Sequence, residues 1–364
     1  MKLLVMPVSG GGFVVQLAAL QLLSGINFVP DVTLGSSGGN VAAYVGAAAN
    51  WRRAGIERIA RELSNNLFVQ SWNSFSFMAF LLGYYKGELY NCGNGVEEFL
   101  QRHFADDTIG YYELWTGTYN QQRQRACLFS NRSRGETTLD PTIIDIDMAQ
   151  CLPPVYTDGN FSLIAKASSA SASIPALVPA QVIFGENYVD GGVSSASPLT
   201  VMKEPIIHYM KNTHQPLHLV YINSDNLSAP PDVTINTALD RTKQAIDALI
   251  RSHGVIDRQI GYDIIRCHNP DGEIHKDEFP CTPDNLQRLS TIWDNLHCSM
   301  LEVYPQKGVE VNITDFTGDD VLDKIAEARD ICHCRLWWVT SHQLQLTASI
   351  RSLIDSCKSV STNT

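Results

Sequence analysis

One segment indicates how this chain folds: Val29-Pro30-Asp31-Val32-Thr33-Leu34-Gly35-Ser36-Ser37-Gly38-Gly39-Asn40. Residues 29–34 form a short apolar run that favours a strand, and the alanine-rich residues 40–49 favour a helix. Between them, residues 35–39 fit G-x-S-x-G, in which a serine occupies a sharp turn from a strand into a helix. This register selects Ser37, because a motif centred on Ser36 would place Leu34 where the turn requires glycine. The segment therefore predicts a strand, a tight turn that carries Ser37, and a helix.

The glycines of this turn have a geometric role. Exposing the Ser37 hydroxyl forces its backbone into a sparsely populated conformation, and the strand and helix close around it only where Cβ atoms are absent. Gly35 and Gly39 are the flanking positions that meet this requirement. Ser37 also begins the helix, where unpaired N–H groups and the macrodipole favour developing negative charge. A chance match in a chain of this length occurs about one time in ten, so the motif needs independent support.

The N-terminal residues predict a first strand and helix. Residues 3–8 indicate a buried strand, Gly10-Gly11-Gly12 a tight loop, and residues 13–23 an apolar helix. The apolar run at the N-terminus is short and meets three glycines instead of a cleavage site, so a core strand is favoured over a signal peptide. Strands alternating with helices imply a parallel sheet with helices on its faces. Both glycine loops follow strands, so both should lie at the carboxyl edge of that sheet, where α/β folds bind ligands.

Further elements are predicted along the chain. The strand candidates are residues 126–130, 142–146, 161–165, 182–184, 188–189 and 217–223, and the helix candidates are residues 95–104 and 319–329.

Composition excludes some classes of function. The 364 residues carry a formal net charge of −11 and contain no run of basic side chains, which argues against a non-specific nucleic-acid binder. The same charge disfavours electrostatic docking to an anionic membrane, so any lipid contact would come from apolar surface. No stretch reaches the roughly 18 apolar residues of a spanning helix, and we expect no integral membrane segment. The sequence does not indicate an oligomeric state.

Cysteine usage indicates a reducing compartment, because the nine cysteines are odd in number and irregularly spaced. Cys332-His333-Cys334 has the residue types of a zinc site, but adjacent residues point in divergent directions and no second pair accompanies them. We therefore expect no metal and a cytoplasmic location.

Gly10-Gly11-Gly12 does not fit the nucleotide-binding loops. A dinucleotide fingerprint requires glycine or alanine at position 15, where the chain has Val15, and the Gly-Lys-Ser/Thr ending of a phosphate-binding loop is missing. We therefore expect no cofactor. The alternative role is an oxyanion hole, in which small residues direct backbone N–H groups to the oxygen that becomes charged when Ser37 attacks a carbonyl.

Three blocks of the sequence resemble the patatin-like phospholipases. They are Ser9-Gly10-Gly11-Gly12, the elbow at residues 35–39, and the small-residue segment 167–175 that leads to Tyr188-Val189-Asp190-Gly191-Gly192 and Pro198-Leu199. The blocks follow the order of that family, and the C-terminal part resembles the tail of bacterial-type members. The resemblance implies an α/β fold with three layers, α/β/α, and a mainly parallel central sheet. It also implies a single domain over residues 1–364, with a catalytic core at 1–224 and a C-terminal helix and strand extension at 225–364.

The resemblance further implies a lipid acyl hydrolase of the phospholipase A type. Ser37 would be the nucleophile and Asp190 the general base, and the oxyanion hole would comprise Gly10, Gly11, Gly12 and Phe13. The reaction would pass through an acyl-enzyme that water then cleaves. A carboxylate can act as this base only if desolvation in an apolar cleft raises its pKa well above its ordinary value of about 4.

The implied substrates are fatty-acyl esters of phospholipids, galactolipids or neutral glycerides, cleaved without calcium. The expected partner is therefore a lipid or a membrane surface, with which the protein would associate peripherally. Residues 67–85 carry aromatic side chains at helical spacing, which is typical of core packing, with an acyl-chain pocket or a membrane-facing lid as the alternative. Family members usually have arginine or lysine followed by glycine near the positions of Val14 and Val15. The sequence around the predicted oxyanion loop therefore departs from the family pattern.

Two other functions fit parts of the sequence. An α/β-hydrolase would pair Ser37 with a late histidine, although in that fold the elbow follows several strands. The candidate histidines are His297, His333 and His342. A catalytically weak or silent lipid-binding protein on the same scaffold is favoured by Val14 and Val15 and disfavoured by the intact Ser37 and Asp190.

Overall fold

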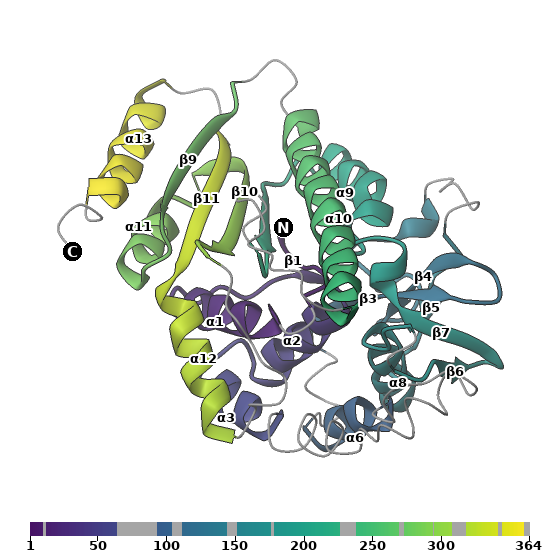
Figure 1. Ribbon diagram of the computed structural model, residues 1–364. Helices are drawn as coiled ribbons and strands as arrows, with labels where there is room; N and C mark the ends of the chain where they lie inside the picture. The colour runs from purple at the N-terminus through teal and green to yellow at the C-terminus, as the bar shows by residue number, and fades with distance from the viewer. Residues whose placement is uncertain are drawn as a thin grey trace.

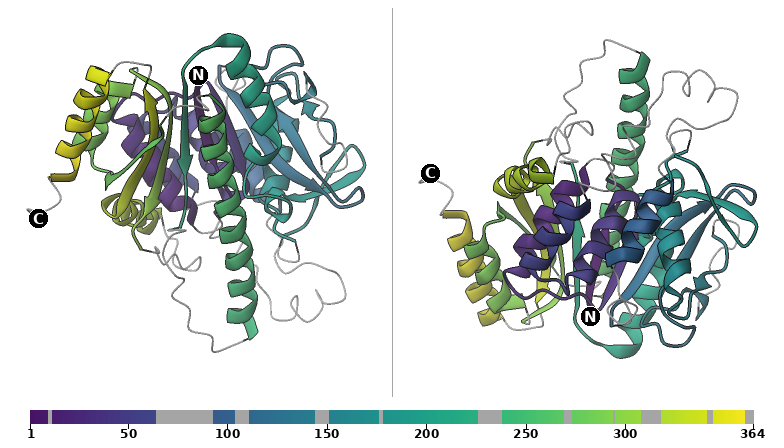
Figure 2. Two further views of the ribbon diagram at one scale, coloured as in Figure 1. Left: turned by 90° about the horizontal axis from the view of Figure 1, so that it is seen from above. Right: turned by 90° about the horizontal axis from the view of Figure 1, so that it is seen from below.

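Strands β1 (Lys2–Met6) and β2 (Val32–Ser36) pair in parallel at the centre of a twisted sheet (Figure 1). The structure, a computed structural model, describes residues 1–9, 12–63, 93–103, 111–143, 151–175, 178–225, 238–268, 273–293, 295–307, 318–340 and 344–359. Helices cover both faces of the sheet, as Figure 2 shows from above and below. The three-layer α/β/α architecture expected from the sequence is confirmed.

The sheet is parallel in its middle and antiparallel toward its edges. Its order is β5-β4-β3-β2-β1-β8-β10-β11-β9, and the pairs from β3 through β2, β1 and β8 to β10 are parallel. The remaining strands are β3 (Glu113–Asn120), β4 (Arg125–Ser130), β5 (Val155–Tyr156), β6 (Gln181–Ile183), β7 (Glu186–Asp190), β8 (Leu217–Ile222), β9 (His275–Pro280), β10 (Leu296–Pro305) and β11 (Cys332–Thr340). The last three strands extend the same sheet with residues that follow the expected catalytic core.

The helices divide between the two faces. The described helices are α1 (Phe13–Ser24), α2 (Ser37–Ala48), α3 (Arg53–Leu63), α6 (Gly93–His103), α8 (Phe161–Ser171), α9 (Leu199–Thr213), α10 (Ala238–His268), α11 (Pro283–Trp293), α12 (Gly318–Asp330) and α13 (Leu344–Ser359). Leu4 and Met6 of β1 join a core with α1, α2 and α12, whereas Leu3 and Val5 join a second core with α9 and α10. Alternate side chains of β1 thus enter opposite cores, which is the reason for its continuous apolar sequence.

Several predicted elements are confirmed with small shifts of their ends. The strand predicted at residues 29–34 is β2, which begins only at Val32 because Pro30 lacks an N–H to donate to a ladder. The apolar helix at residues 13–23 is α1, and it is buried on all sides. The elements predicted at 3–8, 40–49, 95–104, 126–130, 182–184, 188–189, 217–223 and 319–329 correspond to β1, α2, α6, β4, β6, β7, β8 and α12.

Two strand predictions were wrong. Residues 161–165 begin α8, whose first turn is capped by the Asn160 side chain accepting a hydrogen bond from the Leu163 N–H at 3.1 Å. A short apolar run does not distinguish a strand from a buried helix, and the capping asparagine was an available signal for the helix. Pro141–Ile143 form a short 3-10 turn, so the strand predicted at residues 142–146 does not begin there.

Some predictions concern residues outside the described parts of the chain. The aromatic segment at residues 67–85 is one, and Gly10 and Gly11 are another. Among the residues that the structure describes, no helix is both long enough and apolar enough to cross a membrane.

Candidate active site

Ser37 lies at the junction of β2 and α2, as the elbow motif predicts. Its φ is +56°, in the left-handed region that a residue with a side chain seldom adopts. The two flanking glycines permit the turn: a Cβ at Gly35 would lie 2.8 Å from the Asn40 Cα, and one at Gly39 would overlap the carbonyl oxygens of Pro7 and Met6. Helix α2 therefore packs directly against the end of β1, and a residue larger than glycine at position 39 would displace the helix.

Asp190 reaches Ser37 because β2 and β7 meet end to end beside β3. Ser36, the last residue of β2, is opposite Gly117 of β3, and Asp190, the last residue of β7, is opposite the next residue, Thr118. A Cβ at Gly117 would overlap the Ser36 Oγ, so this glycine allows the junction to close. The consequence is a hydrogen bond of 2.6 Å donated by the Ser37 Oγ to the Asp190 Oδ2.

Two further hydrogen bonds hold Asp190, one to its carboxyl and one from its backbone. Its Oδ1 accepts a hydrogen bond from the Gly192 N–H at 2.7 Å, and its own N–H donates to the Ser173 carbonyl at 2.9 Å. Burial raises the pKa of Asp190 from 3.8 to about 6, against the hydrogen bonds from Ser37 and Gly192, which lower it. A carboxylate with this pKa is ionised at neutral pH and is a stronger base than an exposed aspartate.

Helix α8 holds the backbone of the elbow. The Ser37 N–H donates to the Ser171 Oγ at 2.9 Å, and that hydroxyl donates to the Gly117 carbonyl at 2.6 Å. One turn earlier, Ser168 accepts a hydrogen bond from the Asn40 side chain. These serines lie in the small-residue segment 167–175, and their role was not predicted from the sequence. Their three-residue spacing on one helix face was the available signal.

The structure describes Gly12 and Phe13 of the predicted oxyanion loop. Gly12 donates its N–H to the Ser9 carbonyl at 2.8 Å, and a Cβ on Gly12 would lie 2.6 Å from the Ser224 Cβ. Phe13 is buried and begins α1. Val14 and Val15, which depart from the family pattern, are fully buried in the core. A lysine or arginine at either position would be enclosed by apolar side chains, so the helix as packed here requires the valines.

The two candidate histidines that the structure describes lie away from Ser37. His297 is close enough to His218 to influence its pKa, and His218 is opposite Lys2 at the amino end of β1, the opposite edge from the elbow. His333 is on β11, four strand positions from β2 and thus roughly 19 Å away at about 4.8 Å per strand. His342 lies outside the described residues.

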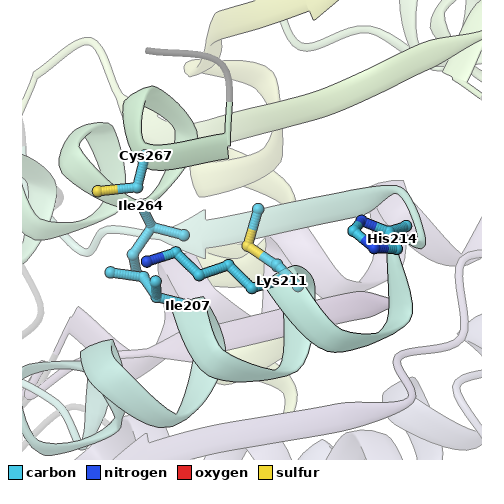
Figure 3. A pocket seen from close by; sticks show the side chains of 6 residues that line it. Ile207, Lys211, His214, Ile264 and Cys267 are labelled. Carbon is cyan, nitrogen blue, oxygen red and sulfur yellow. The ribbon is translucent and has the colours of Figure 1, made fainter.

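One pocket of about 220 Å³ lies between α9 and α10 (Figure 3). Its lining residues are Ile207, Met210, Lys211, His214, Ile264 and Cys267. They belong to the C-terminal halves of the two helices, so the pocket is at the far end of α9 from Asp190. The described residues contain no group of three or more side chains arranged to hold a metal ion.

The sequence matches the model of a known protein family. A model of the Patatin family, described as patatin-like phospholipase, matches residues 8–203, more than half of the chain. The matched part contains Ser37, Asp190, the elbow glycines and the glycine loop, and it ends within α9. No curated protein matches the sequence.

Proposed function

Because this chain belongs to the patatin-like phospholipase family, we propose that it hydrolyses fatty-acyl ester bonds of lipids through a Ser37–Asp190 dyad. Membership supports lipid acyl hydrolysis at the level of the family. The observation that carries the dyad is the 2.6 Å hydrogen bond from the Ser37 Oγ to a buried carboxyl. The two residues are 153 positions apart, and the contact joins the elbow at residues 35–39 to the Asp190-Gly191-Gly192 motif.

The proposed reaction has two halves. The Asp190 Oδ2 accepts the proton of the Ser37 hydroxyl as Oγ attacks the ester carbonyl carbon, and the same proton passes to the departing alcohol when the ester bond breaks. The acyl group is then an ester of Ser37. A water molecule gives a proton to Asp190 and attacks this ester, and the fatty acid leaves as the proton returns to Ser37. No cofactor or metal is required in either half.

The negative charge on the carbonyl oxygen would be stabilised at the start of α2 and by the loop of Gly10, Gly11, Gly12 and Phe13. In the structure the Gly12 N–H already donates a hydrogen bond to the Ser9 carbonyl. The Gly12 N–H would therefore reach the oxygen only if the turn opened, and the other amides of the loop are the better candidates.

We place the activity in the cytoplasm, at the surface of lipid membranes. The eight cysteines that the structure describes are free thiols, which agrees with a reducing compartment. The lipid substrate requires peripheral access to a membrane.

An active-site-directed fluorophosphonate tests the nucleophile. We expect it to label the folded wild type, because an activated serine displaces its fluoride and becomes phosphonylated, and we expect Ser37→Ala to abolish labelling. Ser36→Ala is the matched control, since it removes the neighbouring hydroxyl and should keep the label. Labelling that persists in Ser37→Ala, or is absent from the folded wild type, would contradict the proposal and favour a silent lipid-binding protein.

The raised pKa of Asp190 predicts an acidic limit to activity. The base must be ionised, and its pKa is about 6, so kcat/KM should fall about tenfold per pH unit below that value and level off above it. The pH profile should be measured with a soluble, uncharged ester, so that neither the substrate nor a lipid aggregate titrates. A midpoint near pH 4 would show that the carboxyl is not desolvated in solution.

A further inference from the structure

The last turn of helix α8 lies beside both members of the proposed dyad. The helix packs against α2, which begins with Ser37, against β7, which ends with Asp190, and against β3, which pairs with both β2 and β7. Its last residue, Ser171, and Ser173 just beyond it are fully buried. Each of these two serines forms a hydrogen bond with one member of the dyad. The turn is therefore placed to fix the separation of Ser37 and Asp190.

The Ser171 hydroxyl joins the elbow to β3. Its Oγ accepts the Ser37 N–H at 2.9 Å and donates its own proton to the Gly117 carbonyl at 2.6 Å. Because a hydroxyl that donates a hydrogen bond becomes a better acceptor, the two bonds strengthen each other. The φ of Ser37 is +56°, a conformation that a residue with a side chain keeps only where its surroundings impose it. The bond to Ser171 is one such constraint, since it fixes the amide of the strained residue.

The Gly117 carbonyl also contacts the turn at the end of β7. A Cβ on Gly191 would lie 2.5 Å from the Gly117 oxygen, so the backbone of this turn packs directly on the group to which Ser171 donates. Gly117 is opposite Ser36, the last residue of β2, in the ladder of β2 and β3. One carbonyl thus lies beside both the elbow and the carboxylate turn, and the Ser171 hydroxyl holds it.

Ser173 holds the carboxylate residue through its backbone. Its carbonyl accepts the Asp190 N–H at 2.9 Å. The helix sets the position of Ser173, because its N–H donates to the Ala170 carbonyl at 3.0 Å and its hydroxyl donates to the Ser169 carbonyl at 2.8 Å. One turn of α8 therefore supports both of the residues that the 2.6 Å hydrogen bond of the dyad joins.

We propose that Ser171 is a positioning residue for the nucleophile: its hydroxyl holds the Ser37 amide and the Gly117 carbonyl at the spacing that brings the Ser37 Oγ to Asp190. The inference rests on the proposed function. Ser171 acts through the backbone of Ser37 and takes no part in proton transfer. Its loss should therefore slow the chemical step and leave substrate binding nearly unchanged.

Steady-state kinetics of Ser171→Ala on a soluble, uncharged ester test this role. We expect kcat to fall by about tenfold to a hundredfold with little change in KM, because a small displacement of the Ser37 Oγ misaligns its attack. The acidic midpoint of the kcat/KM profile should move upward, since the hydrogen bond from Ser37 lowers the pKa of Asp190 and would be weakened. The rate of fluorophosphonate labelling should fall together with kcat.

Ser171→Cys separates the hydrogen bonds from packing. The thiol fills nearly the same space as the hydroxyl but is a weak donor and acceptor, so cysteine should resemble alanine in kcat and midpoint. Should alanine fail to fold, the cysteine variant carries the same test. Ser130→Ala is the matched control: Ser130 is a buried serine of β4 whose hydroxyl accepts the Arg132 N–H at 3.1 Å, and its loss should change neither quantity. Thermal unfolding shows whether each variant is folded.

Wild-type kcat and midpoint in a folded alanine or cysteine variant would overturn the inference, in the case of cysteine because packing alone would then suffice. An equal loss of activity in Ser130→Ala would also overturn it, because the removal of any buried hydroxyl would then have the same effect. Failure of the proposed function is a different result: the wild type itself would hydrolyse no ester, and Ser37 would not be labelled.

Discussion

Ser37→Ala, Asp190→Asn and the double variant are expected to lower kcat/KM for fatty-acyl ester hydrolysis by about 10⁴-fold or more, and by similar factors. A single hydrogen bond of 2.6 Å joins the two side chains, and neither side chain can support the proposed reaction without the other. Residues that act as a unit are strongly non-additive. Each single loss should therefore leave only the rate supported by binding and by backbone donors.

The variants should remain folded. The pKa of Asp190 is raised above its unfolded value of 3.8 to about 6, so ionised Asp190 lowers the free energy of unfolding as pH rises from about 4 to 6. Asparagine is uncharged and should be no less stable at neutral pH. Release of fatty acid from a defined lipid mixture measures activity, with Asp158→Asn, an exposed carboxylate, as the control. Full turnover in Asp190→Asn, together with loss in His297→Ala or His333→Ala, would contradict the dyad.

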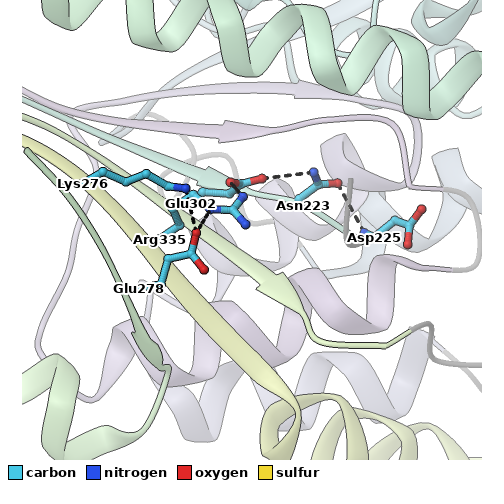
Figure 4. Close-up of polar contacts among 6 residues, drawn as sticks. All are labelled: Asn223, Asp225, Lys276, Glu278, Glu302 and Arg335. Carbon is cyan, nitrogen blue, oxygen red and sulfur yellow. Dashed lines mark hydrogen bonds and ion pairs between the residues drawn. The ribbon is translucent and has the colours of Figure 1, made fainter. Parts of the chain in front are cut away.

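Arg335→Ala is expected to lower the free energy of unfolding by about 3–5 kcal/mol. The Arg335 guanidinium is buried between two carboxylates, donating to Glu302 at 2.6 Å and to Glu278 at 2.7 Å (Figure 4). Glu302 is only 1% exposed. Without the arginine it keeps one weak contact, from Asn223 at 3.5 Å, and an unpaired charge remains in the interior.

Urea unfolding at neutral pH measures this loss. Lys324→Ala is the surface control, since it breaks an exposed pair with Glu327 and should change stability by less than about 1 kcal/mol. Replacing both partners, as Arg335→Met with Glu302→Leu, should recover most of the stability, because no unpaired charge is left. A stability of Arg335→Ala equal to that of wild type would show that Glu302 takes up a proton or water at no cost.

Residues that need a particular backbone were predictable from the sequence. The elbow at Ser37 and the turn after Asp190 carry glycines at positions where the structure has no room for a Cβ, such as Gly35, Gly39 and Gly192. Such a requirement is local, so the motif reveals it. Helix α8 was missed for the converse reason: residues 161–165 are apolar in either structure, and packing against α2 and β3 decides between them.

The α/β order of elements and the turn that presents Ser37 could be predicted from the sequence, because strand, helix and glycine-turn preferences act over a few residues. The candidate carboxylate at Asp190 came from the resemblance to a known family. Tertiary structure decided what surrounds that pair. The Ser171 hydroxyl that accepts the Ser37 N–H, the hydrogen bond from Ser37 to Asp190, and the burial that raises the pKa of Asp190 all depend on residues distant in the chain. No local pattern records them, since they arise only when β7 meets the end of β2 beside β3 and α8 packs against α2 and β7.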